Sequence, residues 1–162
     1  MKKGTITTIS TIIGAGVGVI IGGIGFGALK QQQINSKTEK VDKFKGYYNL
    51  LNQWLMIKQS GKTLETYFID KGFKSIAIYG MGEMGTRLYD ELKNTEIEIK
   101  YAIDKNALSS MSEIEVVETE DNFEKVDAII VTATFAFIEI EEELKKKVDY
   151  PIVSLEDVVF ES

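Results

Sequence analysis

Apolar and charged residues follow three successive patterns along the chain. Residues 4–29 include no charged residue, and this length is sufficient for a helix that crosses the hydrocarbon core of a bilayer. Apolar residues then recur at helical spacing, and further along short apolar runs alternate with turns and polar helical segments. The sequence therefore predicts three parts: a transmembrane anchor over residues 1–30, a helical connector over 31–72 and a globular domain over 73–162.

The uncharged N-terminal stretch is rich in small residues, which recur every four positions at Ser10, Gly14, Gly18 and Gly22. This spacing places them on one helix face, where small side chains let membrane helices approach closely. The alternative explanation is that glycine is frequent in membrane helices in general. We expect a homo-oligomer, or a membrane-protein partner, to form through this face, with residues 5–29 in contact with the lipid bilayer.

Lysine residues are unequally distributed about the uncharged stretch, since two precede it and five follow it within residues 30–45. The positive-inside rule places the more basic side in the cytoplasm. A cleaved signal peptide is the weaker interpretation, because its apolar region usually spans only about 7–15 residues. We therefore expect a single-pass protein of the cell inner membrane with a cytoplasmic C-terminal domain.

The connector contains apolar residues whose spacing alternates between three and four: Val41, Phe44, Tyr48, Leu51 and Leu55. This spacing predicts an amphipathic helix from Lys37 to Lys58, with Tyr47 and Trp54 beside the apolar face. Two heptads are too few to indicate a coiled coil, which needs about three or four. The alternative to pairing with another helix, which is that this helix packs on the globular domain, is equally well supported.

Five short runs in the globular part predict β-strands, at residues 75–79, 97–103, 115–117, 127–132 and 151–154. The fourth run is nearly continuously apolar, as is typical of a central strand in a parallel sheet. Strands that alternate with helices predict an α/β fold. We expect a half-Rossmann parallel sheet of about five strands in the order 3-2-1-4-5, with helices on both faces, preceded by the transmembrane and connector helices.

A glycine-rich motif, Gly80-Met81-Gly82-Glu83-Met84-Gly85, follows the first predicted strand and opens a helix. Gly80 permits the tight turn, Gly82 leaves room for a pyrophosphate at the helix N-terminus, and Gly85 lets the helix pack close to the strand. Glu83 suits the helix dipole but repels a phosphate if its side chain points inward. With a strand before it and a helix after it, the motif predicts a cofactor-binding loop made of these six residues.

Three further residues are candidates for ligand contacts. Asp104 ends the second predicted strand, 19 residues beyond Gly85 and close to the offset of about 20 at which an acid binds the ribose hydroxyls. The alternative role for Asp104 is to cap a turn with Asn106. Lys105 can receive a 2′-phosphate, so NADP is a candidate as well as NAD. Thr132, at the end of the fourth strand, is expected to line the crevice or to cap a helix.

Composition and charge exclude several kinds of functional site and one class of partner. The chain contains no cysteine and no histidine, which excludes disulfides, Cys/His zinc sites and histidine-based catalytic triads. We expect no metal site and identify no catalytic residue. Residues 75–162 carry 21 acidic and eight basic residues, a balance that would repel a phosphate backbone. Nucleic acid is therefore not an expected partner.

The stretches IAIYGMGEMG, IKYAIDKNA, VDAIIVT and PIVSLEDV resemble the NAD(P)-binding Rossmann superfamily. Over about residues 62–160 the chain is similar, more narrowly, to nucleotide-binding modules attached to bacterial glycosyltransferases, sugar acetyltransferases and other surface-polysaccharide enzymes. The resemblance implies that the ligand is NAD, NADP or a nucleotide-sugar, and that the protein serves polysaccharide biosynthesis together with partner proteins.

Three functions follow from these observations. The first is a membrane-anchored nucleotide-binding module. The second is an NAD(P)-dependent oxidoreductase completed by oligomerisation, and the third is a Rossmann scaffold that binds only protein partners. The intact glycine motif followed by Asp104 favours a ligand-binding protein over the scaffold, although a fold alone does not establish a function.

Overall fold

The computed structural model describes residues 37–38, 40–105 and 113–162. The chain divides into two compact units, Met1–Lys45 and Gly46–Ser162, and each is described by itself. The described residues of the first unit are helical, and residues 46–59 of the second unit are helical as well. The strands and the helices from residue 65 onward all belong to the second unit.

The sheet of the second unit has five parallel strands in the order β3-β2-β1-β4-β5, which is the predicted order. The strands are β1 (Ser75–Tyr79), β2 (Glu98–Ile103), β3 (Val116–Val117), β4 (Ala128–Val131) and β5 (Ile152–Ser154). Tyr79 is paired with Ile103 on one side and with Val131 on the other. The carboxyl ends of the three inner strands therefore meet at one edge of the sheet.

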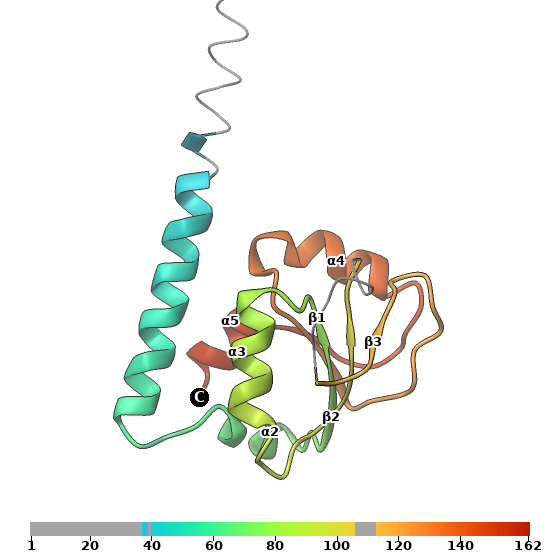
Figure 1. Cartoon of the computed structure of the whole chain (residues 1–162), viewed down its shortest axis with the longest axis horizontal. Helices are drawn as coiled ribbons and strands as arrows, with labels where there is room; N and C mark the ends of the chain where they lie inside the picture. Colours follow the sequence, from blue (N-terminus) through green and yellow to red (C-terminus); the bar gives the residue numbers. More distant parts are fainter. Residues whose placement is uncertain (1–36, 39, 106–112) are drawn as a thin grey trace, which may run out of the picture. The chain divides into compact units, whose positions relative to one another are not determined.

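The helices of the second unit cover both faces of this sheet. They are α2 (Glu65–Lys71), α3 (Glu83–Leu92), the 3-10 turn η2 (Thr134–Ala136), α4 (Phe137–Leu144) and α5 (Leu155–Phe160). Residues of α3 and α5 pack on one face of the sheet and residues of α4 on the other. Figure 1 shows α3 and α5 beside the strands and α4 at their upper end. Two separate hydrophobic clusters fill the two interfaces, because alternate residues of a strand point to opposite faces.

Strand β1 contributes to both clusters. Ile76 and Ile78 pack with α3 and α5, whereas Ala77 and Tyr79 pack toward α4. All four residues of β4 are buried, so the prediction of a central strand is confirmed. A strand that is covered on both faces needs an unbroken apolar run, and this run is what the sequence supplies.

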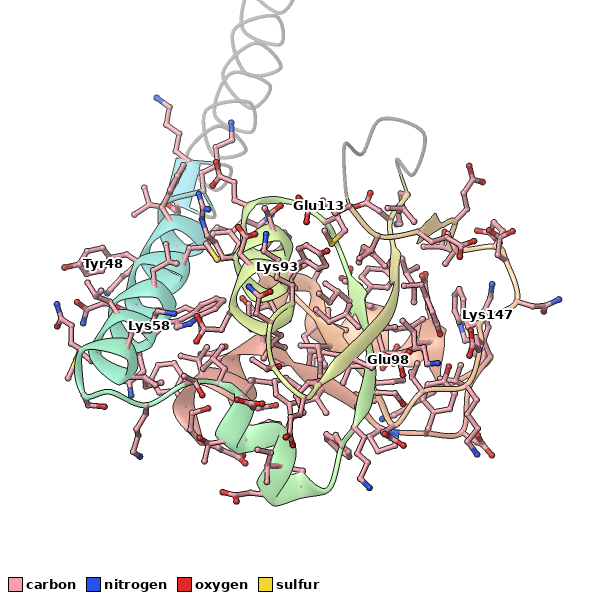
Figure 2. All side chains as sticks on the ribbon, turned by 60° about the horizontal axis from the view of Figure 1, so that its bottom comes forward. Tyr48, Lys58, Lys93, Glu98, Glu113 and Lys147 are labelled. Carbon is pink, nitrogen blue, oxygen red and sulfur yellow. The ribbon has the colours of Figure 1, made fainter. Side chains whose placement is uncertain are left out.

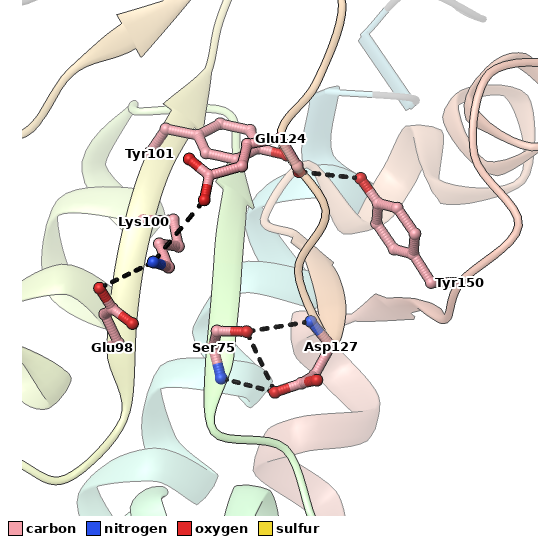
Figure 3. A network of polar contacts seen from close by, with 7 residues as sticks. All are labelled: Ser75, Glu98, Lys100, Tyr101, Glu124, Asp127 and Tyr150. Atoms are coloured by element: carbon pink, nitrogen blue, oxygen red, sulfur yellow. Dashed lines mark hydrogen bonds and ion pairs between the residues drawn. The ribbon is translucent and has the colours of Figure 1, made fainter.

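The amino-terminal end of β1 is fixed by the carboxylate of Asp127. Its Oδ2 accepts hydrogen bonds from the backbone N–H groups of Lys74 and Ser75, each at 2.8 Å, and from the Ser75 hydroxyl at 3.1 Å. Figure 3 shows Ser75 and Asp127 of this cluster, below Lys100, which forms ion pairs with Glu98 and Glu124. The backbone hydrogen bonds lower the pKa of Asp127, because they favour the charged carboxylate.

The transmembrane helix of the predicted fold class is not found among the described residues. Within the described ranges no helix is long and apolar enough to cross a membrane. The helix through residues 40–59 carries charged residues near both its ends, and α3, with 10 residues, is far shorter than the roughly 20 that a span requires. The predicted anchor over residues 1–30, with its lipid contact through residues 5–29 and its small-residue face, lies outside the described residues.

The apolar face predicted for the connector helix does not pack on the domain. Its members are exposed: Val41 62%, Phe44 76%, Tyr48 69%, Leu51 42% and Leu55 53%. The buried face is formed instead by Leu50, Trp54 and Ile57, which join the cluster under α3 and α5, with Tyr47 packed against it. The helix carries two apolar stripes with the same spacing, and the one that contains the single tryptophan is the buried one.

Candidate functional site

The glycine loop joins β1 to α3 at the carboxyl edge of the sheet. Gly80 has φ +93°, a conformation that residues with a side chain rarely adopt. Its N–H donates to the carbonyl of Ile103 at the end of β2, at 2.8 Å. A Cβ at this position would lie 2.9 Å from Oγ1 of Thr132. Both the backbone conformation and the available space therefore require glycine at position 80.

The other two glycines differ in what the fold demands of them. A Cβ on Gly85 would lie 2.1 Å from the carbonyl oxygen of Gly80, so the close approach of α3 to the loop depends on Gly85. A Cβ on Gly82 would meet no described atom within 4 Å, and the residue has an ordinary φ of −69°. The fold thus requires Gly85 but not Gly82, and the space over Gly82 is open at the N-terminus of α3.

Asp104 is bonded directly to the glycine loop. Its Oδ2 accepts a hydrogen bond from the backbone N–H of Met81 at 2.8 Å. The predicted acid at the end of β2 and the predicted loop are therefore parts of one arrangement. A carboxylate can accept about four hydrogen bonds through its two oxygens, so a contact with the loop does not use up its capacity.

Thr132, which follows β4, contacts the backbone carbonyl groups at the start of the loop. Its side chain is buried, and Oγ1 lies 2.7 Å from the carbonyl oxygen of Gly80 and 3.1 Å from that of Tyr79. The hydroxyl donates its single proton to one of these two carbonyls. Thr132 lines a cavity near the loop, as expected, but its hydroxyl is directed at the loop and not at the cap of a helix.

The remaining predicted residues have different surroundings. The side chain of Met84 is 8% exposed and lies in the hydrophobic cluster, and Met81 packs against the same cluster. Glu83 is exposed in the first turn of α3, and Lys105 is exposed after the end of β2. Met84 can therefore offer a ligand only its backbone groups, whereas Glu83 and Lys105 can offer side chains.

Two neighbouring cavities open at the loop. One, of about 330 Å³, is lined in part by Gly80, Asp104 and Lys105. The other, of about 210 Å³, is lined in part by Gly82, Glu83 and Thr132. The structure thus brings the predicted residues of the loop together with those that follow β2 and β4. A concave site with a few convergent polar groups is the usual form of a small-molecule site.

Several residues of these cavities were not predicted from the sequence: Tyr47, Tyr79, Phe135, Glu139, Ile140 and Glu143. Phe135 borders both cavities and packs edge-to-face on Tyr47, with ring centroids 5.9 Å apart. Glu139 and Glu143 lie four residues apart on α4, so they share a helix face. The signal that could have indicated them is their position after β4, since ligands of parallel sheets bind beyond the carboxyl ends of the strands.

The larger cavity is acidic. Asp104, Glu139 and Glu143 line it, and Lys105 is the one cation among its described lining residues. Burial raises the pKa of Tyr79, and the negative charges of Glu143 and Asp104 raise it further. The pKa of Tyr47 is raised in the same way, by burial and by Glu83. Both phenols therefore stay protonated at neutral pH, and the cavity suits hydroxyl groups and neutral rings better than it suits phosphates.

A known protein family matches part of the chain. Searches of curated proteins and of solved structures each returned no significant similarity. A family model described as C2185-like, N-terminal, matches residues 72–153, which extend from just before β1 into β5 and include the glycine loop, Asp104, Lys105 and Thr132. The chain therefore belongs to the C2185-like, N-terminal family.

Proposed function

We propose that the second unit is a nucleotide-binding module of the Rossmann type, whose ligand is an adenosine dinucleotide. The observation that carries the proposal is the 2.8 Å hydrogen bond from the Met81 N–H to Asp104, which joins the glycine loop to the acid after β2. In dinucleotide-binding sheets these two elements hold the pyrophosphate and the ribose of one ligand. Their direct connection supports the same two roles in this chain: the loop binds the pyrophosphate and Asp104 binds the ribose.

The loop suits the pyrophosphate. The N-terminus of a helix presents backbone N–H groups and the positive end of the helix dipole to an anion. Helix α3 begins at Glu83 without a side-chain cap, and the space over Gly82 is open in the described part of the chain. An incoming phosphate can thus approach these amides without displacing a side chain of the loop.

The larger cavity suits the adenosine. The carboxylate of Asp104 accepts hydrogen bonds from the ribose hydroxyls, and Tyr79 and Ile140 provide apolar surface for a neutral ring. A 2′-phosphate would add charge beside Asp104 and Glu143, with only Lys105 among the lining residues to offset it. The proposal therefore favours NAD over NADP.

Calorimetric titration of the purified full-length chain tests the proposal. We expect NAD to bind more tightly than NADP, and a uridine nucleotide-sugar to bind weakly or not at all. Tight binding of the nucleotide-sugar without NAD would assign the loop to the other class of pyrophosphate ligand. If none of the three binds, the module is not a nucleotide-binding protein and acts through protein contacts alone.

Asp104→Ala is expected to weaken NAD binding by about 1.5–3 kcal/mol, the range for hydrogen bonds to a charged group. The same change should weaken NADP less, because it also removes the repulsion of the 2′-phosphate. Asp104→Asn is the matched control for the loop, since its side-chain oxygen can still accept the Met81 N–H. Equal losses of NAD and NADP in the alanine variant would contradict a ribose contact.

A further inference from the structure

The helix over residues 46–59 packs on its domain along its inner side and near both ends. On the inner side, three apolar residues that are at most 5% exposed belong to the hydrophobic cluster with α3 and α5: Leu50, Trp54 and Ile57. Near the carboxyl end, Lys58 forms an ion pair with Glu91 of α3. Near the amino end, Tyr47 packs edge-to-face on Phe135 of η2, with ring centroids 5.9 Å apart. Through Tyr47 the helix therefore contacts the segment that follows β4.

Tyr47 also lines the smaller cavity at the glycine loop, the one of about 210 Å³. Its neighbours in that lining include Gly82 and Glu83, at the N-terminus of α3. Burial raises the pKa of Tyr47, and the nearby charge of Glu83 raises it further, so the ring lies close to the start of α3. Among the described lining residues of this cavity, Tyr47 is the one that the helix over residues 46–59 supplies. The helix is therefore part of the wall of the candidate site.

The two cavities at the loop share Gly80 and Phe135 and therefore adjoin each other. In the proposed site the adenosine lies in the larger cavity and the pyrophosphate lies at Gly82, which lines the smaller one. The part of a dinucleotide beyond its pyrophosphate then continues into the smaller cavity, where Tyr47 and Phe135 present their rings. Aromatic side chains are the usual apolar walls of such sites. A dinucleotide in this position thus contacts Tyr47.

We propose that Tyr47 is a nucleotide-binding residue, and that ligand binding and docking of the helix over residues 46–59 stabilise each other. The inference rests on the nucleotide-binding function proposed above. Tyr47 completes the site only while the helix is docked, so the docked state binds the ligand more tightly than the undocked state. A ligand shifts such an equilibrium by its differential affinity for the two states, and the coupling is reciprocal. The ligand therefore holds the helix against the domain.

Hydrogen exchange of the full-length chain with and without NAD measures the effect on the helix. At saturating NAD, backbone amides near Tyr47 are expected to exchange about tenfold more slowly, because they exchange through local undocking, which the ligand opposes. Helix α2 is the internal control, since none of its residues is among those that line either cavity at the loop. Its exchange through local opening should stay unchanged.

Tyr47→Ala is expected to raise the dissociation constant of NAD about tenfold, because it removes the ring from the cavity and breaks the ring pair with Phe135. Tyr47→Phe keeps the ring and should bind NAD within about twofold of the wild type. Tyr48→Ala is the matched control, since Tyr48 is 69% exposed, lines neither cavity and is directed away from the strands in Figure 2. This variant should bind NAD as the wild type does. Calorimetric titration measures all three affinities.

Two results would overturn the inference while the proposed function stands. One is binding of NAD to the wild-type chain without slower exchange near Tyr47, and the other is unchanged NAD affinity in Tyr47→Ala. Circular dichroism verifies that the alanine variant is folded, and if it is not, the exchange experiment on the wild-type chain decides. Failure of the wild-type chain to bind NAD in calorimetry would instead refute the proposed function, and this inference with it.

Discussion

Replacing Gly82 by valine is expected to abolish binding of NAD to the full-length chain while the domain stays folded. Gly82 has an ordinary extended backbone, and a Cβ there meets no described atom within 4 Å. The fold therefore tolerates a side chain, at a cost of about 1 kcal/mol for the poorer helix cap. The branched side chain would fill the space through which a pyrophosphate reaches the amides of α3. Calorimetric titration with NAD measures the effect.

Thr66→Val is a control for the change of side chain alone, because it places a valine at an exposed position on α2, outside both cavities at the loop. We expect this variant to bind NAD with unchanged affinity. Chemical denaturation of both variants verifies that the fold is intact. Retained NAD affinity in Gly82→Val would show that the ligand does not approach α3 at this point, and the proposed site would have to be abandoned.

The sheet could be predicted from the sequence because its signals are local and agree with one another. The apolar run of β4 requires cover on both faces, and the turn at Gly80 separates β1 from a helix with apolar residues at helical spacing. Right-handed crossovers then leave few possible strand orders. The observed order followed from these constraints and needed no information on side-chain contacts.

The buried face of the connector helix could not be predicted in the same way. Tyr47, Leu50, Trp54 and Ile57 have the same alternating spacing as the predicted apolar face, so periodicity does not distinguish the two. What decides between them is the shape of the surface they meet, which is formed by residues far away in the sequence. The buried stripe contains the only tryptophan of the chain, whose large apolar surface favours burial.

The segment between β3 and β4 is another part of the structure that the local sequence pattern does not predict. Residues 121–125 resemble a helical turn in sequence, but the structure has no helix there. The carbonyl of Glu124 accepts hydrogen bonds from the hydroxyls of Tyr101, at 2.6 Å, and Tyr150, at 3.3 Å, and Figure 3 shows the second of these. Backbone groups that are satisfied by distant side chains do not need a helix, and such partners are invisible to periodicity.

The glycine loop of the candidate site could be predicted from the sequence, but the acidic residues of α4 that line its cavity could not. The glycine spacing and the position of Asp104 identified two elements that the structure joins through the Met81 N–H. The acidic side chains of Glu139 and Glu143 belong to α4, more than thirty residues later, and nothing near the loop indicates them. They matter because they make the cavity acidic, and this is the reason why the proposed ligand is NAD and not NADP.

The second large effect is expected at Gly85, where alanine should destabilise the domain by about 2–4 kcal/mol. The added Cβ would lie 2.1 Å from the carbonyl oxygen of Gly80, and a backbone atom cannot give way as a flexible side chain can. Helix α3 would have to move away from the loop and from the cluster it packs on through Leu88 and Leu92. Urea denaturation of the full-length chain measures the loss.

Gly82→Ala is the matched control, since it adds the same methyl group three residues earlier in open space and should cost about 1 kcal/mol or less. Equal stabilities of the two alanine variants would contradict the close packing of α3 on the loop. The pair also separates two roles within one motif. A Gly85 variant should lose NAD affinity only together with stability, because displacement of α3 disturbs the loop and its bond to Asp104. At Gly82 a side chain should reduce affinity while stability is nearly kept, which is the behaviour of a glycine retained for a ligand.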